Sequence, residues 1–359
     1  MDLRRSRLRS GLRHRGLLRA ALRGRRRPPL PAALPQAVAV SAVAHLPAAS
    51  SAWLPVSPCA PDVCLRAQAR TAGPLRRAAR LAGAAAVLLA GLPIALALGR
   101  TARRGAVTTW WSRLLLRALG IRIVTRRGFS CIGGSARARA VPEEDGPALL
   151  VGNHVSWLDP LVITATFACR PLAKAEVGRW PIVGTLASGG GALFIDRDRL
   201  SALPGVVADM TAALRRGESV AAFPEGTTWC GREMGRFRPA VFQAALDAGV
   251  PVRPLALRFL EGTAVHGGTG VHEGTGERAA LSTRPSYVGD DTLLASVLRI
   301  VATRDLVAEV TVFPAVRPDR PAAYGGPVHR REARTALARI AEAQVRTGLM
   351  EPEEQAVAA

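Results

Sequence analysis

From residue 147 onward, short apolar segments alternate with stretches of helical spacing, and this alternation constrains the fold more than any other feature. The apolar runs have the length of strands, and the segments between them place apolar residues three and four positions apart, as amphipathic helices do. Predicted strands cover residues 148–152, 191–195, 219–223, 251–259 and 307–313, and predicted helices cover residues 160–168, 203–216, 239–248, 291–303 and 329–347. This order is typical of an α/β fold with a mostly parallel sheet flanked by helices.

The net charge of +22 is concentrated in the first part of the chain, outside the predicted sheet. Residues 1–104 contain 19 arginines against Asp2 and Asp62, a net charge of +17, which leaves +5 for residues 105–359. Residues 1–74 are rich in Arg, Pro and Ala, a composition that rarely packs a core, so we expect a disordered extension there. The near balance of charge in the rest of the chain argues against nucleic acid as a partner.

An uncharged apolar segment at residues 81–99 has about the length of a helix that crosses a bilayer. Arginines flank it on both sides, which gives no orientation by the positive-inside rule but attracts the head groups of anionic membrane lipids. Helical spacing continues over residues 110–123, where Trp110 and Trp111 fit either a head-group position or a core. We therefore expect a membrane-associated helical segment at residues 75–125; a re-entrant or interfacial helix and a buried helix of a soluble protein are the alternatives.

The five cysteines give no sign of a disulfide scaffold. They are Cys59, Cys64, Cys131, Cys169 and Cys230. Only the first two lie close together, and their spacing matches no common zinc template. We expect mostly reduced thiols in a protein at the cytoplasmic face of the cell membrane.

The segment NHVSWLD at residues 153–159 lies between a predicted strand and a predicted helix. His154 can act as a general base near neutral pH, because histidine is the side chain type suited to proton transfer in that range. Asp159, expected as the N-cap with Pro160 as the first helical residue, can meet the second ring nitrogen of His154 across the turn and fix its tautomer. A capped turn without catalysis is the alternative for this segment taken alone.

Three further segments follow or contain predicted strands. In FPEGTT, residues 223–228, Gly226 permits close approach of the backbone, and amides with hydroxyls can hold phosphate oxygens. The segment GGGALFIDR, residues 189–197, ends in Arg197, which can bind a phosphate with two hydrogen bonds. The segment VPVRPLAL, residues 250–257, is typical of a core strand bounded by proline. Each of the three also fits an ordinary turn, ion pair or strand.

In this order, the four segments resemble the motifs of the glycerolipid acyltransferase family, to which 1-acylglycerol-3-phosphate acyltransferases and other lysophospholipid acyltransferases belong. The resemblance covers residues 105–320, and it is complete at residues 153–159 and 223–228. It implies an acyltransferase α/β domain at residues 126–320, followed by a C-terminal helix and tail at residues 321–359.

The resemblance also implies a role for each motif. His154 and Asp159 would be the catalytic pair that moves a fatty-acyl group from acyl-CoA or acyl-carrier protein to the hydroxyl of a lysophospholipid, first of all 1-acylglycerol-3-phosphate. The implied substrate-binding residues are Arg197, Glu225, Gly226, Thr227 and Lys174. Neither a metal nor a cofactor besides the acyl donor is implied. Other members of the family acylate other lyso-lipids, including amino-acid lipids, and the motifs do not distinguish these acceptors.

Three other functions compete with this interpretation. A hydrolase would need a nucleophile, but the sequence has no Gly-X-Ser-X-Gly elbow, and Ser156 does not lie in a comparable turn. A nucleic-acid-binding module would draw on the Arg-rich residues 1–27, which lack interleaved aromatic residues. A non-catalytic relative is disfavoured because His154, Asp159 and Glu225 are all present.

Overall fold

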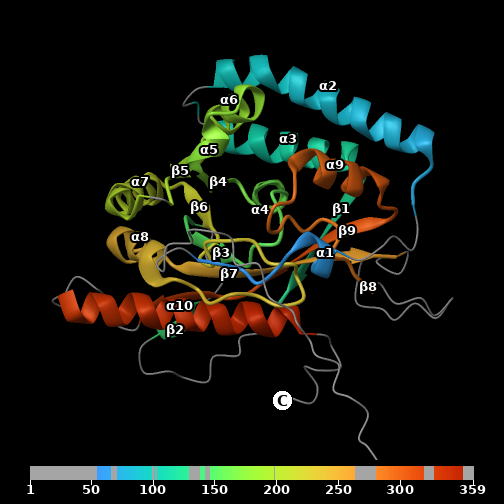
Figure 1. Cartoon of the computed structure of the whole chain (residues 1–359). Helices are drawn as coiled ribbons and strands as arrows, with labels where there is room; N and C mark the ends of the chain where they lie inside the picture. The colour runs from blue at the N-terminus through green and yellow to red at the C-terminus, as the bar shows by residue number, and fades with distance from the viewer. Residues whose placement is uncertain are drawn as a thin grey trace, which may run out of the picture. The chain divides into compact units, whose positions relative to one another are not determined.

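A mostly parallel sheet lies at the centre of the protein in the computed structural model (Figure 1). The structure describes residues 55–65, 71–98, 101, 103–128, 138–141, 146–197, 199–262, 280–318 and 327–350. Most of the extension predicted to be disordered, including residues 1–54, lies outside the described residues.

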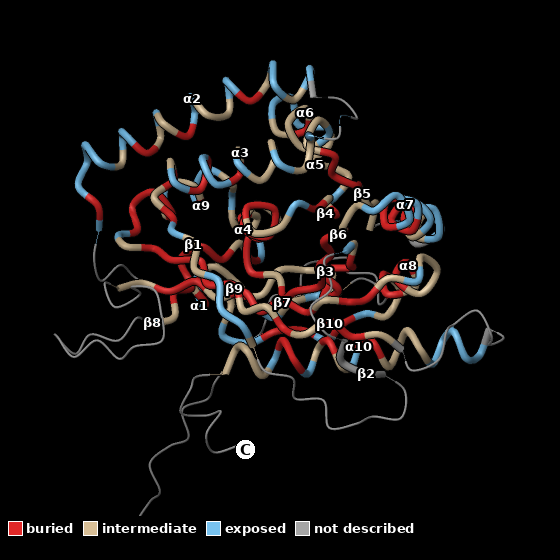
Figure 2. Tube along the Cα trace, turned by 180° about the vertical axis from the view of Figure 1, so that it is seen from behind, coloured by how far each residue is buried: buried red, intermediate tan, exposed pale blue. Residues whose placement is uncertain are grey.

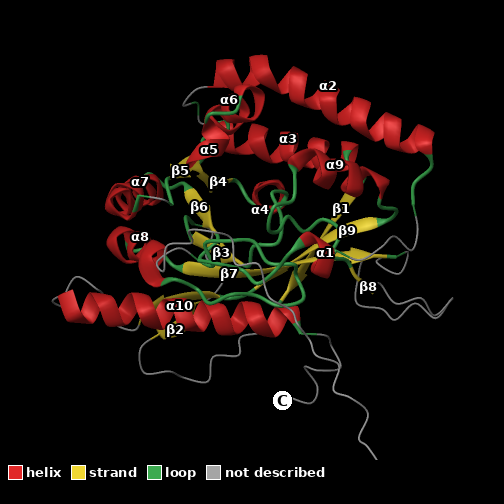
Figure 3. Ribbon diagram, viewed as in Figure 1, coloured by secondary structure: helices red, strands yellow, loops and turns green. Residues whose placement is uncertain are grey.

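Seven strands form the main path of the sheet (Figure 3). In spatial order they are β1 (Ile121–Arg127), β9 (Leu306–Val312), β7 (Val252–Glu261), β3 (Leu149–Gly152), β6 (Ser219–Ala222), β4 (Cys169–Lys174) and β5 (Leu193–Ile195). The five strands from β7 to β5 are parallel to one another, whereas β9 runs antiparallel to β7 and parallel to β1. Short antiparallel strands extend the sheet: β10 (Ala315–Pro318) pairs with β2 (Ala138–Val141) and β7, and β8 (Ala280–Leu281) pairs with β7. The predicted α/β fold is confirmed.

Helices cover both faces of the sheet, and each face has its own core (Figure 1). On one face lie α7 (Leu203–Arg215), α8 (Phe242–Ala248, preceded by the 3₁₀ turn Pro239–Val241) and α10 (Pro327–Leu349). On the other face lie α2 (Pro74–Leu98), α3 (Arg104–Ala118), α4 (Asp159–Thr166) and α9 (Leu293–Ala302). Leu149 and Val151 of β3 point into the first core and Leu150 into the second, which explains why this strand is an uninterrupted apolar run.

The short helices occupy the connections. They are α1 (Pro61–Cys64), α5 (Ala175–Gly178), α6 (Pro181–Gly189) and the 3₁₀ turn Leu200–Ala202. Strand β4 and helix α6 lie in a stretch for which the sequence predicted no element, between the predicted helix at 160–168 and the predicted strand at 191–195.

The segment expected to be helical at residues 75–125 contains two helices and the beginning of a strand. The predicted helix at 110–123 is wrong at its end, because α3 stops at Ala118 and β1 starts at Ile121. Gly120 between them has φ = +84°, a left-handed conformation that ends a helix and that glycine adopts without steric cost. Residues 121–125 therefore belong to the sheet and not to the hydrophobic helical segment.

Helix α2 is the one described helix that is long and apolar enough to cross a membrane, over Pro74–Ala97. Only 17% of the most apolar 18-residue stretch of this helix is buried within the protein. Figure 2 shows most of the helix in the colours of exposed and intermediate residues. The helix packs against α3, where the indole Nε1 of Trp111 donates a 3.3 Å hydrogen bond to the carbonyl of Val87. Trp110, its neighbour, remains largely exposed.

Candidate active site

Three of the four sequence motifs meet at one edge of the sheet, beyond the carboxyl ends of parallel strands. His154 follows β3, Glu225 follows β6 and Arg197 follows β5. Strands β3 and β6 pair directly, and β4 separates β6 from β5. Open α/β sheets bind their ligands at this edge.

His154 and Asp159 form a hydrogen-bonded pair. Nδ1 of His154 lies 2.8 Å from Oδ2 of Asp159. The Asp159 side chain is fully buried, and the His154 side chain is 12% exposed. Because a carboxylate faces Nδ1, the neutral imidazole carries its proton on that atom, which leaves Nε2 as the atom that can accept a second proton.

The same oxygen of Asp159 also holds the turn between β3 and α4. It accepts backbone hydrogen bonds from Val155 at 2.5 Å and from Ser156 at 2.7 Å. The predicted N-cap position is wrong by one residue, because Leu158 is the N-cap and Asp159 the first helical residue. The carboxylate still lies at the N-terminus of α4, where the helix dipole favours negative charge.

The loop that follows β6 supports His154 on several sides. The ring of Phe223 stacks on the imidazole with 4.3 Å between ring centroids and 16° between ring planes. Glu225 accepts a 2.7 Å hydrogen bond from the backbone N–H of His154, and the backbone N–H of Trp229 donates a 2.8 Å hydrogen bond to the His154 carbonyl. Two motifs that are far apart in the sequence therefore build one structure around a single histidine.

Glu225 is buried and connects two backbone segments. Its second oxygen accepts a 2.7 Å hydrogen bond from the N–H of Gly235. Burial raises the pKa of Glu225 to about 8; the two backbone hydrogen bonds oppose this shift, and the charge of Asp159 adds to it. Because both oxygens bind backbone amides, Glu225 positions the His154 loop, while its expected part in substrate binding stays a prediction.

Asn153, for which the sequence predicts no role, anchors the chain directly before the histidine to the neighbouring strand. Its side-chain Nδ2 donates a 3.0 Å hydrogen bond to the carbonyl of Leu257 on β7, and its Oδ1 accepts a 2.8 Å hydrogen bond from the Leu257 N–H. The fourth motif, residues 250–257, thus contributes backbone partners, as a core strand can. Only the position of Asn153 next to His154 hinted at its importance.

Arg197 reaches the loop after β6. Its Nη1 donates a 2.5 Å hydrogen bond to the carbonyl of Gly226. Burial lowers the pKa of Arg197 and the charge of Glu176 offsets part of this shift, but a guanidinium remains charged at neutral pH. Gly226 has φ = +77°, and an added Cβ would lie 2.6 Å from Cγ of Pro55, so the position requires glycine.

A pocket of about 450 Å³ lies beside this contact. Its lining includes Pro55, Ile195, Arg197, Phe223, Gly226 and Arg238. Phe223 also stacks on His154, so the pocket adjoins the ring that supports the histidine. Its apolar walls also include four arginines, Arg197, Arg199, Arg238 and Arg334, and the acidic Asp196. Apolar walls with an excess of positive charge suit a ligand with a hydrocarbon part and an anionic part.

Three predicted substrate-binding residues lie outside the lining of this pocket: Glu225, described above, and also Thr227 and Lys174. Thr227 is in the loop after Gly226, and Lys174 ends β4, where its ammonium pairs with Glu176 at 3.1 Å. Among the described residues, neither contributes to the pocket wall. The structure thus gathers His154, Asp159, Glu225, Gly226 and Arg197, with Lys174 at the margin.

A larger cavity of about 820 Å³ lies at the opposite ends of the strands, beside the starts of β4, β5 and β6. Its charged lining includes Arg104, Arg170 and Arg216, which all pair with Glu218. In the described part of the chain, the only residues of the four motifs that line it are Gly190 and Leu193, and neither has a functional group that could react or bind an ion. We therefore locate the candidate site at the carboxyl ends of the strands.

Similarity to known proteins agrees with the geometry. A sequence model of the Acyltransferase family matches residues 133–258, which contain all of the predicted site residues. A lyso-ornithine lipid O-acyltransferase of Rhodobacter capsulatus is 30% identical over 202 residues, which make up 52% of this chain and 67% of that protein. The chain belongs to the glycerolipid acyltransferase family.

Other members of the family are more similar over part of their length. The 1-acyl-sn-glycerol-3-phosphate acyltransferase of Neisseria gonorrhoeae is 34% identical over 172 residues, 48% of this chain and 61% of that protein. The lyso-ornithine lipid O-acyltransferase of Pseudomonas aeruginosa is 32% identical over 205 residues, 56% of this chain and 66% of that protein. The chain therefore spans less than two thirds of both relatives, and their names differ in the acceptor lipid.

Proposed function

We propose that this glycerolipid acyltransferase moves a fatty-acyl group from acyl-CoA or acyl-carrier protein to the free hydroxyl of 1-acylglycerol-3-phosphate, giving phosphatidic acid. The observation that carries the proposal is the 2.8 Å contact between Nδ1 of His154 and the buried Asp159, at the carboxyl end of β3. Family membership and the pocket beside Arg197 support it.

His154 acts as the general base in this mechanism. Its Nε2 accepts the proton of the acceptor hydroxyl while the oxygen attacks the thioester carbonyl, and Asp159 stabilises the imidazolium that forms. The tetrahedral intermediate then collapses, the C–S bond breaks, and the departing thiolate takes the proton from His154. The acceptor supplies the nucleophile, so a covalent acyl-enzyme is not required.

The acceptor phosphate binds near Arg197 and the loop at Gly226 and Thr227. The charged guanidinium of Arg197 lines the pocket. A guanidinium can bind two oxygens of one phosphate through two parallel hydrogen bonds. Holding the head group there orients the acceptor hydroxyl toward His154, and orientation of this kind accounts for a large part of many enzymatic rate enhancements.

A lyso-ornithine lipid is the second candidate acceptor, because several relatives are named for it, among them the enzymes of Pseudomonas aeruginosa and Rhodobacter capsulatus. A lyso-ornithine lipid has an amino-acid head group in place of a phosphate monoester, so the two candidates differ in the anion that meets Arg197. A panel of both acceptors with one labelled acyl-CoA decides between them by the product formed.

The proposed location is the membrane, with α2 as the attachment. Its exposed apolar residues include Leu75, Leu89 and Leu96, and Trp110 of α3 is exposed on the neighbouring helix. Burying such side chains in lipid is favourable by about 25 cal/mol per Å² of apolar surface. A variant with aspartate at all three leucines should no longer float with liposomes; unchanged flotation would contradict attachment through α2.

The decisive test of the activity is His154→Ala, assayed with labelled acyl-CoA in the presence and absence of acceptor. We expect the loss of acyl transfer by at least about 10³-fold, because the general base is gone, with an unchanged melting temperature. His329→Ala, at an exposed histidine of α10, is the matched control and should keep full activity. Near-normal turnover by His154→Ala refutes the mechanism, and equal release of free fatty acid with or without acceptor indicates a thioesterase instead.

A further inference from the structure

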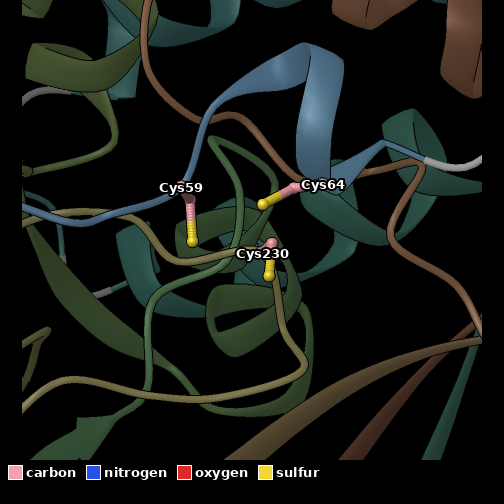
Figure 4. A group of neighbouring side chains, drawn as sticks. All are labelled: Cys59, Cys64 and Cys230. Atoms are coloured by element: carbon pink, nitrogen blue, oxygen red, sulfur yellow. The ribbon is translucent and has the colours of Figure 1, made fainter. Parts of the chain in front are cut away.

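Three cysteines that the proposed reaction does not use lie together on one side of the protein. Cys59, Cys64 and Cys230 are all buried, and their sulfur atoms lie within 4.8 Å of one another. Figure 4 shows the three side chains as neighbours where two chain segments meet. Cys59 and Cys64 come from residues 55–65, the N-terminal strap, and Cys230 comes from the loop that follows β6.

Hydrogen bonds fix the backbone at each corner of this cysteine cluster. The Cys59 N–H donates to Oγ of Ser57, and the Cys64 N–H closes the single turn of α1. The carbonyl of Cys230 accepts a 2.9 Å hydrogen bond from Oγ of Ser286. The short distances between the three sulfur atoms therefore belong to segments whose backbone is hydrogen-bonded at each cysteine.

Neither a disulfide nor a reactive thiolate accounts for the arrangement. A disulfide would join two of the cysteines and leave the third as an unused buried thiol. A reactive thiol must be accessible to its target, and all three of these side chains are buried. A metal ion, in contrast, uses all three sulfur atoms: zinc–sulfur bonds of about 2.3 Å place neighbouring sulfurs about 4 Å apart.

We propose that Cys59, Cys64 and Cys230 bind a thiophilic d¹⁰ metal ion, Zn²⁺ or Cu⁺, through three thiolates. Each coordinated thiol releases one proton to solvent as its metal–sulfur bond forms. Cu⁺ would be three-coordinate, whereas Zn²⁺ would complete a tetrahedron with one small exogenous ligand. The guanidinium of Arg232, which donates to the Cys64 carbonyl at 3.3 Å, adds positive charge beside the resulting anionic site.

The ion would cross-link the N-terminal strap to the loop that follows β6 and so hold the strap next to the candidate active site. Pro55 of the strap packs on Gly226 and forms part of the pocket wall. Trp229, next to Cys230, donates its backbone N–H to the carbonyl of His154. The site is thus separate from the reaction chemistry, and the sequence could not show it because its third ligand lies far from the Cys59–Cys64 pair.

Metal analysis of the purified full-length chain tests the proposal. We expect one equivalent of zinc or copper per chain, with the two metals distinguished by elemental mass spectrometry. Addition of Cd²⁺ to the chelated protein should produce a thiolate charge-transfer absorption. Cys59→Ser, Cys64→Ser and Cys230→Ser should each lose the metal and this absorption. Cys169→Ser is the matched control, since Cys169 is equally buried but lies in β4 outside the cluster.

If the serine variants do not fold, thermal unfolding of the wild-type chain with and without a chelator tests the proposal instead. Chelation should lower the melting temperature by about 5 °C or more, and stoichiometric Zn²⁺ or Cu⁺ should restore it. The proposal is overturned if the reduced protein takes up neither metal on dialysis. It is also overturned if peptide mapping finds two of the three cysteines joined as a disulfide, or if Cys169→Ser loses the metal as fully as the cluster variants.

Discussion

Replacing Asp159 with asparagine separates the charge of the proposed catalytic pair from its geometry. Oδ2 of Asp159 accepts three hydrogen bonds, from Nδ1 of His154 and from the N–H groups of Val155 and Ser156. The amide oxygen of asparagine can occupy the same position and keep these three bonds, so the turn should survive. What disappears is the negative charge that stabilises the imidazolium during proton transfer.

The expected loss of activity follows from the burial of this charge. A hydrogen bond to a charged group contributes about 1.5–3 kcal/mol. Because the Asp159 side chain is fully buried, we expect its hydrogen bond to His154 to lie at the upper end of this range. In Ser-His-Asp enzymes the corresponding change lowers kcat by about 10⁴-fold, because the tautomer is also disturbed. We expect Asp159→Asn to lower kcat/KM by about 10³-fold, which corresponds to about 4 kcal/mol of transition-state stabilisation.

The assay is acyl transfer from labelled acyl-CoA, combined with thermal melts of the same preparations. We expect the melting temperature to change little, because asparagine has nearly the same volume as aspartate. The change also removes a buried carboxylate charge, and Oδ1 of that carboxylate has no hydrogen-bond partner in the described residues. Asp247→Asn is the control: Asp247 lies on α8, binds Gln243 and Arg330, and should keep full activity. If Asp159→Asn retains more than about a tenth of the wild-type kcat/KM, the pair is a structural cap and the general-base argument fails.

Three further changes test the surroundings of the histidine. Gly226→Ala should destabilise the protein by about 1–2 kcal/mol through its positive φ alone, and by more because the new Cβ meets Pro55. Gly249 also has a positive φ, +70°, but has open space around it. Thermal melts of Gly249→Ala therefore measure the cost of the positive φ without the steric clash. Because the pKa of Glu225 is raised to about 8 from an ordinary value of 4.5, the folded state retains a proton that the unfolded state releases, and stability is lost as pH rises from about 4.5 to about 8. Glu225→Gln should remove this loss, so that its melting temperature relative to wild type rises between pH 5 and pH 8; a constant difference would contradict the shifted pKa. Arg197→Lys should raise KM for the acceptor about tenfold with a smaller effect on kcat, because an ammonium cannot bind phosphate with two parallel hydrogen bonds; an unchanged KM in acceptor titrations would remove Arg197 from the head-group site.

The motif-bearing part of the fold was predictable because its strands are buried on both faces and therefore appear as short apolar runs. Strands β3, β6 and β7 were predicted within two residues of their observed bounds for this reason. Strand β1 was missed because its residues continue the apolar and arginine pattern of α3, and only Gly120 marks the change from helix to strand. Hydrophobic spacing alone does not distinguish a helix end from an edge strand that follows it directly.

Within the site, the residue types were predictable but several of their contacts were not. The His154–Asp159 pairing follows from a local turn, so the sequence contained enough information for it. The binding of Glu225 to backbone amides and the amide pair of Asn153 depend on which strands become neighbours, and the sequence order does not reveal this. The cysteine cluster is hidden for the same reason.

The support of His154 from the β6 loop has a consequence for protein engineering. Phe223, Glu225 and Trp229 each contact the histidine or its backbone, and all three belong to a segment about seventy residues downstream. A transplant of residues 149–159 alone into another scaffold would thus transfer His154 and Asp159 without the residues that orient the histidine. The smallest portable unit is discontinuous: it consists of residues 149–159 and 219–235 together with residues 252–257 of β7, where Leu257 binds Asn153. These segments belong to adjacent parallel strands, and a designed host must reproduce both pairings before it can accept the chemistry.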